Sequence, residues 1–297
     1  MKKRNLLIMG MIIAAMTVGA AGCGDTTAEE STDSAQEETA AENTETDGAD
    51  PEETDSQEAD AEETEPVNIL IAAAASLEYS MEDDLIPMFE EQNPDITVEG
   101  TYDSSGKLQT QIEEGLDADV FFSAATKQMN ALVDEGLVNA DSVNNLLENK
   151  IVLIVPNGQE GNYSKFEDIA NAATVALGDP ASVPAGQYAE ESLGNLGLWD
   201  AVSGKASFGT NVTEVLNWVA EGSADAGIVY ATDAATRKDA VTVVAEAPAD
   251  SLAEPVIYPV GMVENSSKKE AAEKFMEFLS SEEAAAVFEE YGFTVNQ

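Results

Sequence analysis

The segment VNILIAAAASLEYSMEDDLIPMF, residues 67–89, decides the fold class of this chain. It opens with the apolar run Val67 to Ile71, whose β-branched residues predict a buried strand. From Leu77 to Phe89 the apolar residues fall at helical spacing, so a helix follows the strand directly. A strand that leads into a helix is the repeating unit of an α/β fold.

The same alternation continues to the end of the chain. Further strands are predicted at 96–98, 120–122, 151–156, 174–177, 227–230, 241–244 and 256–263. Further helices are predicted around 108–116 and 129–133 and at 184–195, 211–221, 267–279 and 281–290. This alternation predicts parallel sheets covered by helices on both faces.

The length of this region fits two α/β lobes with a ligand cleft between them. We place the first lobe at 67–154 plus 258–297 and the second lobe at 155–257. In such sheets, ligands bind beyond the carboxyl ends of the strands, where helix N-termini point.

The chain begins with the features of a secretion signal. Residues 1–22 comprise a basic start, a short apolar run and small residues, and Cys23 follows. The run is too short for a membrane span. A small-residue run that ends in Cys resembles the lipobox of bacterial lipoproteins, which implies cleavage before Cys23 and a lipid on its thiol. The alternative is an ordinary signal peptide with an incidental Cys23.

Residues 24–66 have the composition of a disordered stalk. They hold 18 acidic residues, no Lys or Arg, and no Leu, Ile, Val, Phe, Tyr or Trp. Such a segment buries too little apolar surface to offset the entropy of the chain. We therefore expect residues 23–66 to tether the lobes to a membrane through Cys23.

Composition excludes several classes of function. The 297 residues carry a net charge of -45, and residues 67–297 alone, with 40 acidic and 10 basic residues, carry about -30. Nucleic-acid binding needs clustered Lys and Arg, which this balance disfavours. The chain has no His and only one Cys, so His-based catalysis, His metal ligands and disulfides within the chain are ruled out.

Four predicted helix starts could together bind an anion. Ser76 follows the first strand, Ser105 stands in Ser-Ser-Gly before the next helix, and Ala185 and Val212 follow Pro184 and Asn211. Helix starts present unpaired backbone N–H groups and the positive end of the helix dipole. For Ser76 alone, a structural N-cap is the competing interpretation.

Several motifs in this region resemble the molybdate-binding proteins of molybdate ABC importers. The resemblance covers essentially all of 67–297, in order, and its motifs are highly specific when taken together. They are AAASL (73–77), SSGKL (104–108), DVFFSA (119–124), GDP (178–180), VPAGQYA (183–189), GIVYATDA (227–234) and YGF (291–293).

The resemblance implies a two-lobed periplasmic-binding-protein fold of type II and a site made of uncharged donors. The oxyanion would be held by the hydroxyl and N–H groups of two serines, two backbone N–H groups and one tyrosine hydroxyl, from Ser76, Ser105, Ala185, Val212 and Tyr230. Ser104 is the alternative to Ser105, and Asn211 or Thr213 is the alternative to Val212. Gly106 stands where some relatives have Ser, and this difference does not touch the proposed contacts.

Other conspicuous residues have structural interpretations. We expect Lys107 on a helix surface, Asp179 in a turn, and Tyr188, Trp199 and Trp218 in the core.

The resulting functional hypothesis is an extracytoplasmic, lipid-anchored solute-binding protein, acting as a monomer. It would capture molybdate, and tungstate as well, for the permease of an ABC importer, without catalysis and without a cofactor. A sulfate or phosphate binder on the same fold is the nearest alternative. A secreted carboxylate-dependent hydrolase and a stalked surface adhesin are alternatives from other classes.

Overall fold

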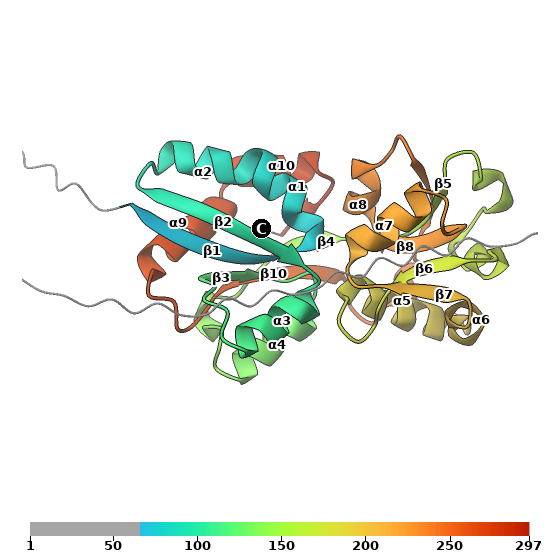
Figure 1. The fold of residues 1–297 in the computed structure, drawn as a ribbon, viewed down its shortest axis with the longest axis horizontal. Coiled ribbons are helices and arrows are strands. Elements are labelled where there is room, and N and C mark those ends of the chain that lie inside the picture. Colours follow the sequence, from blue (N-terminus) through green and yellow to red (C-terminus); the bar gives the residue numbers. More distant parts are fainter. Residues whose placement is uncertain (1–65, 297) are drawn as a thin grey trace, which may run out of the picture. The chain divides into compact units, whose positions relative to one another are not determined.

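Two β-sheets, each covered by helices, make up the part of the chain that the computed structural model describes, residues 66–296 (Figure 1). All of these residues belong to one compact unit, Ala61–Gln297. The predicted signal, Cys23 and the acidic stalk lie outside the described residues. Within residues 66–296, the structure contains no helix with the length and apolar character that crossing a membrane requires.

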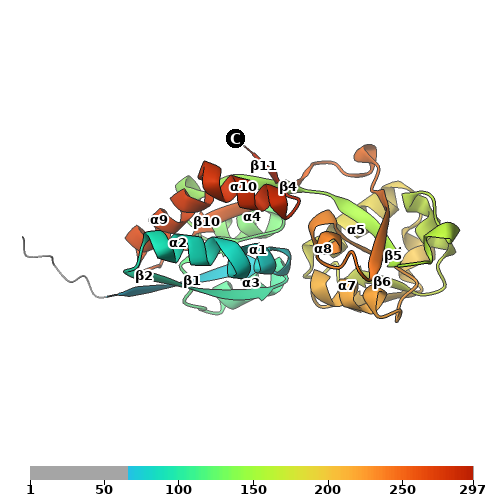
Figure 2. The same ribbon diagram turned by 90° about the horizontal axis from the view of Figure 1, so that it is seen from above.

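The first sheet has the strand order β11-β4-β10-β3-β1-β2. Its strands are β1 (Val67–Ala74), β2 (Ile96–Asp103), β3 (Val120–Phe122), β4 (Asn144–Asn149), β10 (Val256–Met262) and β11 (Thr294–Val295). Its α-helices are α1 (Glu78–Ser80), α2 (Ile86–Gln92), α3 (Ser105–Glu113), α4 (Thr126–Asp134), α9 (Lys269–Leu279) and α10 (Glu282–Glu290). Helices α3 and α4 cover one face, and α2, α9 and α10 cover the other (Figures 1 and 2).

The second sheet has the order β7-β6-β8-β5-β9. Its strands are β5 (Ile151–Pro156), β6 (Val175–Gly178), β7 (Ala206–Gly209), β8 (Ala226–Tyr230) and β9 (Val241–Glu246). Its α-helices are α5 (Pro184–Asn195), α6 (Trp199–Ser203), α7 (Val212–Ala220) and α8 (Ala231–Thr236). Helices α5 and α7 pack on opposite faces of β6 and β8 (Figure 1). We refer to each sheet with its helices as the first and the second lobe.

Strand register places helix starts side by side. The parallel pair β1 and β2 runs in register from Val67 opposite Ile96 to Ala74 opposite Asp103. Both strands therefore end at the same edge, where the helical segment 75–92 and α3 begin. In the second lobe, β6 and β7 end with Gly178 opposite Gly209, ahead of α5 and α7.

Both sheets are mixed, whereas the alternation predicted parallel ones. In the first sheet β10 runs antiparallel to β3 and β4, and in the second β5 runs antiparallel to β8 and β9. These strands carry the chain between the sheets, so no crossover helix within one sheet forces them to be parallel. Apart from this difference, the predicted strands and main helices are confirmed to within a few residues.

The chain passes twice between the two sheets. The expected boundary between 154 and 155 falls inside β5, all of which pairs in the second sheet, so the first change of sheet is at Lys150. The return occurs before β10, which begins at Val256 rather than at 258. Strands β4, β7 and β11 were not predicted.

Candidate functional site

One small cavity is lined by residues of both lobes. Its volume is about 10 Å³, close to the space that a single water molecule needs. Its lining includes all five residues that the sequence singled out: Ser76, Ser105, Ala185, Val212 and Tyr230. Ala74, Ala75, Asp103, Ser104, Ala124, Val183 and Pro184 complete it. A tetrahedral oxyanion is larger than one water, so its entry requires the walls to part.

Three of the five residues lie in the first turn of an α-helix. Ser105 is the first residue of α3, Ala185 follows Pro184 at the start of α5, and Val212 is the first residue of α7. Backbone N–H groups in a first turn have no carbonyl partner within their own helix. The cavity therefore faces N–H donors and positive dipole ends from helices of both lobes.

Ser76 does not cap a helix. The N-cap of its short 3-10 turn, η1 (Ala75–Leu77), is Ala74, and Ser76 lies inside the turn. Its hydroxyl is instead 2.9 Å from the hydroxyl of Tyr258. The capping interpretation of Ser76 is therefore wrong, because the helical segment begins two residues earlier than a cap at Ser76 requires.

Ser105 and Ser104 have different roles at the start of α3. The Oγ of Ser105, a fully buried residue, accepts a hydrogen bond of 2.9 Å from the backbone N–H of Ala124. Ser104 is the N-cap, yet its side chain makes no capping bond, and its buried Oγ has no partner among the described residues. Both serines line the cavity.

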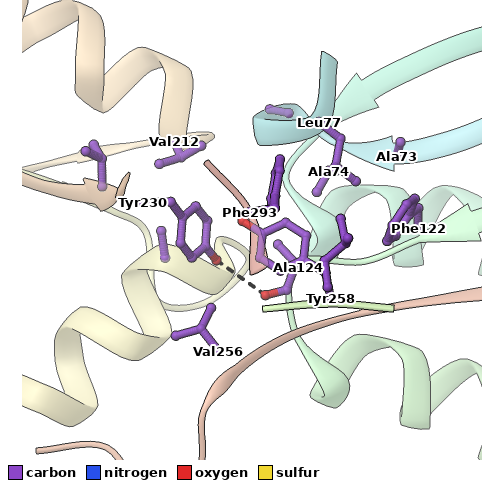
Figure 3. Packing of buried hydrophobic residues seen from close by; sticks show 14 of the residues in the cluster. Ala73, Ala74, Leu77, Phe122, Ala124, Val212, Tyr230, Val256, Tyr258 and Phe293 are labelled. Atoms are coloured by element: carbon purple, nitrogen blue, oxygen red, sulfur yellow. Dashed lines mark hydrogen bonds between the residues drawn. The ribbon is translucent and has the colours of Figure 1, made fainter. Parts of the chain in front are cut away.

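Tyr230 presents its hydroxyl to the first lobe. It ends β8, is 1% exposed, and its ring packs edge-on against Tyr258 at a centroid distance of 5.4 Å. Its Oη donates a long hydrogen bond of 3.4 Å to the carbonyl of Ala124 (Figure 3). Burial raises the pKa of Tyr230 well above its ordinary value, so the hydroxyl stays protonated and remains a donor.

The buried carboxyl group of Asp233 accepts a hydrogen bond from the backbone of Tyr230. Asp233 lies in the first turn of α8, and its Oδ2 accepts a 3.2 Å hydrogen bond from the backbone N–H of Tyr230. Burial raises the pKa of Asp233 to about 7, although hydrogen bonds from backbone N–H groups act in the opposite direction.

Asp103 is the one acidic residue in the lining, and its charge is compensated. Its carboxylate accepts hydrogen bonds from the N–H of Ser104 (2.8 Å), the ammonium of Lys107 (3.1 Å) and the side-chain amide of Asn211 (3.3 Å). Sequence reasoning missed Asp103 as a lining residue, although it directly precedes the Ser-Ser-Gly motif. Lys107 lies on the helix surface with its side chain 35% exposed, and Asp103 is its ion-pair partner.

Two further hydrogen bonds join the lobes around this cavity. The N–H of Gly106 donates to the carbonyl of Ser182 (2.9 Å), and the amide of Gln128 donates to that of Gln187 (3.2 Å). The bond from Asn211 to Asp103 also crosses from the second lobe to the first. The structure thus holds the helix starts of both lobes in direct contact.

The other structural interpretations are confirmed. The Oδ1 of Asp179 accepts from the N–H of Ala181 (3.0 Å) in a turn. Tyr188, Trp199 and Trp218 are partly buried and pack against the core. Asn211 is the N-cap of α7, and its side chain accepts from the N–H of Glu214 (2.9 Å).

A larger hollow elsewhere is less suited to an anion. It has a volume of about 570 Å³ and is lined by Asn139, Asp141, Ser142, Asn144, Met262, Glu273, Met276, Glu277 and Ser280. Three carboxylates and no cation line it, so it would repel an anion despite its size. In the part of the chain that the structure describes, no group of three or more acidic, His or Cys side chains is arranged to hold a metal ion.

Comparison with known proteins finds relatives of this chain among substrate-binding proteins. The chain is 43% identical over 228 residues to YvgL of Bacillus subtilis, named as an ABC transporter substrate-binding lipoprotein, covering 77% of this chain and 86% of that protein. It is 36% identical over 233 residues to the molybdate-binding protein ModA of Escherichia coli, covering 76% and 89%.

A solved structure and a family model extend the comparison. The structure, described as the substrate-binding domain of a molybdenum ABC transporter from Clostridium difficile, superposes with a TM-score of 0.61 at 37% identity, covering 78% of this chain and all of that one. The family model of bacterial extracellular solute-binding proteins matches residues 69–294. The chain therefore belongs to the family of bacterial extracellular solute-binding proteins.

Proposed function

We propose that this protein captures molybdate, and tungstate as well, and delivers it to an ABC importer. The observation that carries the proposal is the single cavity in which Ser76, Ser105, Ala185, Val212 and Tyr230 meet. Each of these residues offers an uncharged donor, either a hydroxyl or a first-turn N–H group. The names of relatives that share 43% and 36% identity with this chain support both the ligand and the transporter.

The ligand would be cargo rather than substrate. Binding would use the hydroxyl and N–H groups of Ser76 and Ser105, the N–H groups of Ala185 and Val212, and the hydroxyl of Tyr230. Hydrogen bonds to a charged group contribute about 1.5–3 kcal/mol each, so several short bonds suffice for tight binding without a Lys or Arg. We propose that the protein acts as a monomer, without catalysis and without a cofactor.

Titration calorimetry of the protein with molybdate, tungstate, sulfate and phosphate tests this function. We expect submicromolar dissociation constants for molybdate and tungstate and no measurable heat from sulfate or phosphate. Sulfate binding as tight as molybdate binding would contradict the proposed ligand. The absence of binding by all four anions would contradict an oxyanion-binding function altogether.

We further propose that Cys23 carries a lipid and anchors the protein to the outer face of the cell membrane. The small-residue run before Cys23 supports this assignment. The wild-type protein should partition with membranes, and Cys23→Ser should release it or leave its signal uncleaved. A Cys23→Ser protein that is still cleaved and membrane-bound would show that the anchor lies elsewhere.

A further inference from the structure

A chain of buried side-chain hydrogen bonds leads from Ser76 away from the cavity. The Oγ of Ser76 lies 2.9 Å from the Oη of Tyr258, which lies 3.2 Å from the Nδ2 of Asn149. The same Nδ2 lies 2.8 Å from the Oγ1 of Thr232 in α8. Tyr258 belongs to β10 and Asn149 ends β4, so both stand on strands next to the crossings between the lobes.

The orientation of the Asn149 amide is set by a neighbour that can only donate. The backbone N–H of Lys150 lies 2.8 Å from the Oδ1 of Asn149. An N–H group cannot accept a hydrogen bond, so the side-chain atom that faces it must be the carbonyl oxygen. The Nδ2 of Asn149 therefore faces Tyr258 and Thr232, and its two hydrogens are donated to them.

The direction of hydrogen-bond donation continues from Asn149 through Tyr258 to Ser76. Tyr258 accepts from Asn149, and burial raises the pKa of Tyr258 well above its ordinary value, so the phenol keeps its proton. Its hydrogen is then available to the Oγ of Ser76, which lies 2.9 Å away. Ser76 accepts that hydrogen bond, and its own hydrogen must point elsewhere, which leaves it free for the cavity that Ser76 lines.

The hydroxyl of Ser105 also accepts a hydrogen bond from behind, here from a backbone N–H group. The backbone N–H of Ala124, which is also donor-only, bonds to the Oγ of Ser105 at 2.9 Å. The acceptor capacity of both serine hydroxyls is thus engaged by a donor behind them. Two independent contacts with the same polarity indicate that the cavity is built to donate hydrogen bonds.

We propose that Asn149 and Tyr258 are positioning residues that hold the hydroxyl of Ser76 as a donor toward the ligand, so that the site selects a fully deprotonated oxyanion over a protonated one. This proposal rests on the proposed function. At pH 7, molybdate, tungstate and sulfate carry no proton, whereas every phosphate and arsenate ion carries at least one. The two serines offer that proton no acceptor, and Asp103, the acidic residue in the lining, already accepts from Ser104, Lys107 and Asn211. An unsatisfied buried donor is costly.

The variant Asn149→Asp reverses the polarity. A carboxylate accepts from the N–H of Lys150 as before, but it also accepts from Tyr258, which must then accept from Ser76. The lone pairs of Ser76 would turn toward the cavity. We expect molybdate affinity to fall about 100-fold, and the ratio of arsenate to molybdate affinity, measured by calorimetry at pH 7, to rise at least about 10-fold.

The hydrogen bonds from Asn149 through Tyr258 to Ser76 form what we call the relay. The variant Tyr258→Phe tests the relay without adding a charge. Ser76 loses the donor behind it, its hydroxyl can rotate, and molybdate affinity should fall about 3- to 10-fold. The ratio of arsenate to molybdate affinity should rise. In a Ser76→Ala background, Tyr258→Phe should leave that ratio unchanged, since the relay acts only through Ser76. Melting temperatures confirm that each variant is folded.

Two controls separate polarity from size and from packing. Sulfate resembles phosphate in size but carries no proton, so the ratio of sulfate to molybdate affinity should not rise in either variant. Thr232→Val removes the other partner of the Asn149 amide. It should lower the free energy of unfolding while leaving the ratio of arsenate to molybdate affinity unchanged.

The outcomes separate this proposal from the proposed function. If the wild type binds molybdate and folded Tyr258→Phe keeps the wild-type ratio of arsenate to molybdate affinity, the relay is wrong while the function stands. Equal effects of Tyr258→Phe with and without Ser76 would also overturn the relay. If the wild type binds no oxyanion, the proposed function fails, and the relay fails with it.

Discussion

At the scale of single residues, the hydroxyl of Tyr230 is the sharpest point at which the site can be tested. It is the one tyrosine hydroxyl in the cavity lining, and its bond of 3.4 Å to Ala124 is long enough to be exchanged for a ligand. Ser76 is the corresponding hydroxyl from the first lobe. Both can be removed with little change in volume.

We expect Tyr230→Phe to weaken molybdate binding by about 10- to 150-fold, which corresponds to one hydrogen bond to a charged group. Ser76→Ala should cost at least as much. Tyr291→Phe is the matched control, because it removes a hydroxyl that bonds to Asp84 at 2.7 Å and does not line the cavity. Calorimetric titration of the three variants checks this. Equal affinities of wild type and Tyr230→Phe would remove Tyr230 from the site.

A second prediction at this scale concerns the pH dependence of stability. The pKa of Asp233 is raised from 3.8 to about 7 in the folded protein. Between these values the folded state keeps a proton that the unfolded state has lost. The contribution of Asp233 is therefore fully present below pH 3.8 and lost as the pH rises toward 7, by an amount on the order of a few kcal/mol.

The variant Asp233→Asn should remove this slope. The difference in free energy of unfolding between Asp233→Asn and wild type should shift in favour of the variant as the pH rises from about 4 to about 7. Urea denaturation across this range measures it. Parallel pH profiles for the two proteins would mean that Asp233 titrates normally in the fold.

At the scale of elements, the start of α3 meets the second lobe so closely that this structure leaves no room for a side chain at Gly106. A Cβ on Gly106 would lie 2.3 Å from the carbonyl oxygen and 2.8 Å from the Cα of Ser182. Both are backbone atoms, so they cannot move aside as a flexible side chain would. The contact between α3 and the segment before α5 therefore depends on the absence of a side chain.

We expect Gly106→Ala to lower molybdate affinity about 10-fold or more, because the added methyl group holds α3 away from Ser182. Stability should not fall, since Ala is favoured over Gly within helices by about 0.5–1 kcal/mol. Gly194→Ala in α5 is the matched control, as its Cβ would meet nothing within 4 Å. Wild-type affinity in Gly106→Ala would show that this contact is dispensable for binding.

The helices and strands differ in how well they could be predicted from the sequence. Helix α5 at Pro184–Asn195 matches its predicted range, because Pro184 marks its start and apolar spacing marks its length. Strand β4, with the sequence NNLLEN, was missed because it lacks β-branched residues and is held by long-range pairing with β10. The mixed sheets were not predicted for the same reason, because the direction of a strand relative to its neighbours depends on pairing between distant segments.

The candidate site divides in the same way. Ser105, Ala185 and Val212 could be proposed as site residues from sequence because each stands in a local helix-start motif. Asn149 and Tyr258 could not, because they are 109 positions apart and neither stands in a motif. Their contact exists only once β4 and β10 pair, so no local signal could have revealed it.

At the scale of the whole molecule, the net charge opposes the proposed ligand. Residues 67–297 carry about -30, and such a field repels an incoming dianion over long distances. Affinity must therefore come from short-range donors in a dry cavity. The five candidate residues are uncharged donors, so they can bind the anion at short range although the net charge of the protein repels it at long range.

Long-range repulsion combined with short-range binding by uncharged donors predicts an unusual salt dependence. Inert salt screens the repulsive field but leaves buried hydrogen bonds intact, so molybdate affinity should stay flat or rise slightly with added salt. A site built on Lys or Arg would weaken instead. Titrations from about 10 mM to about 500 mM of an inert salt, spanning a severalfold change in screening length, measure the slope. A steep loss of affinity would contradict the uncharged-donor mechanism.

In the proposed site, uncharged donors from both lobes converge on one oxyanion. A crystal structure of the protein with molybdate, in which anomalous scattering locates the molybdenum, tests it most directly. We expect one strong peak among Ser76, Ser105, Ala185, Val212 and Tyr230, with ligand oxygens about 2.6–3.2 Å from their donors. Molybdenum bound instead at lysine side chains, with this cavity closed and empty, would contradict it.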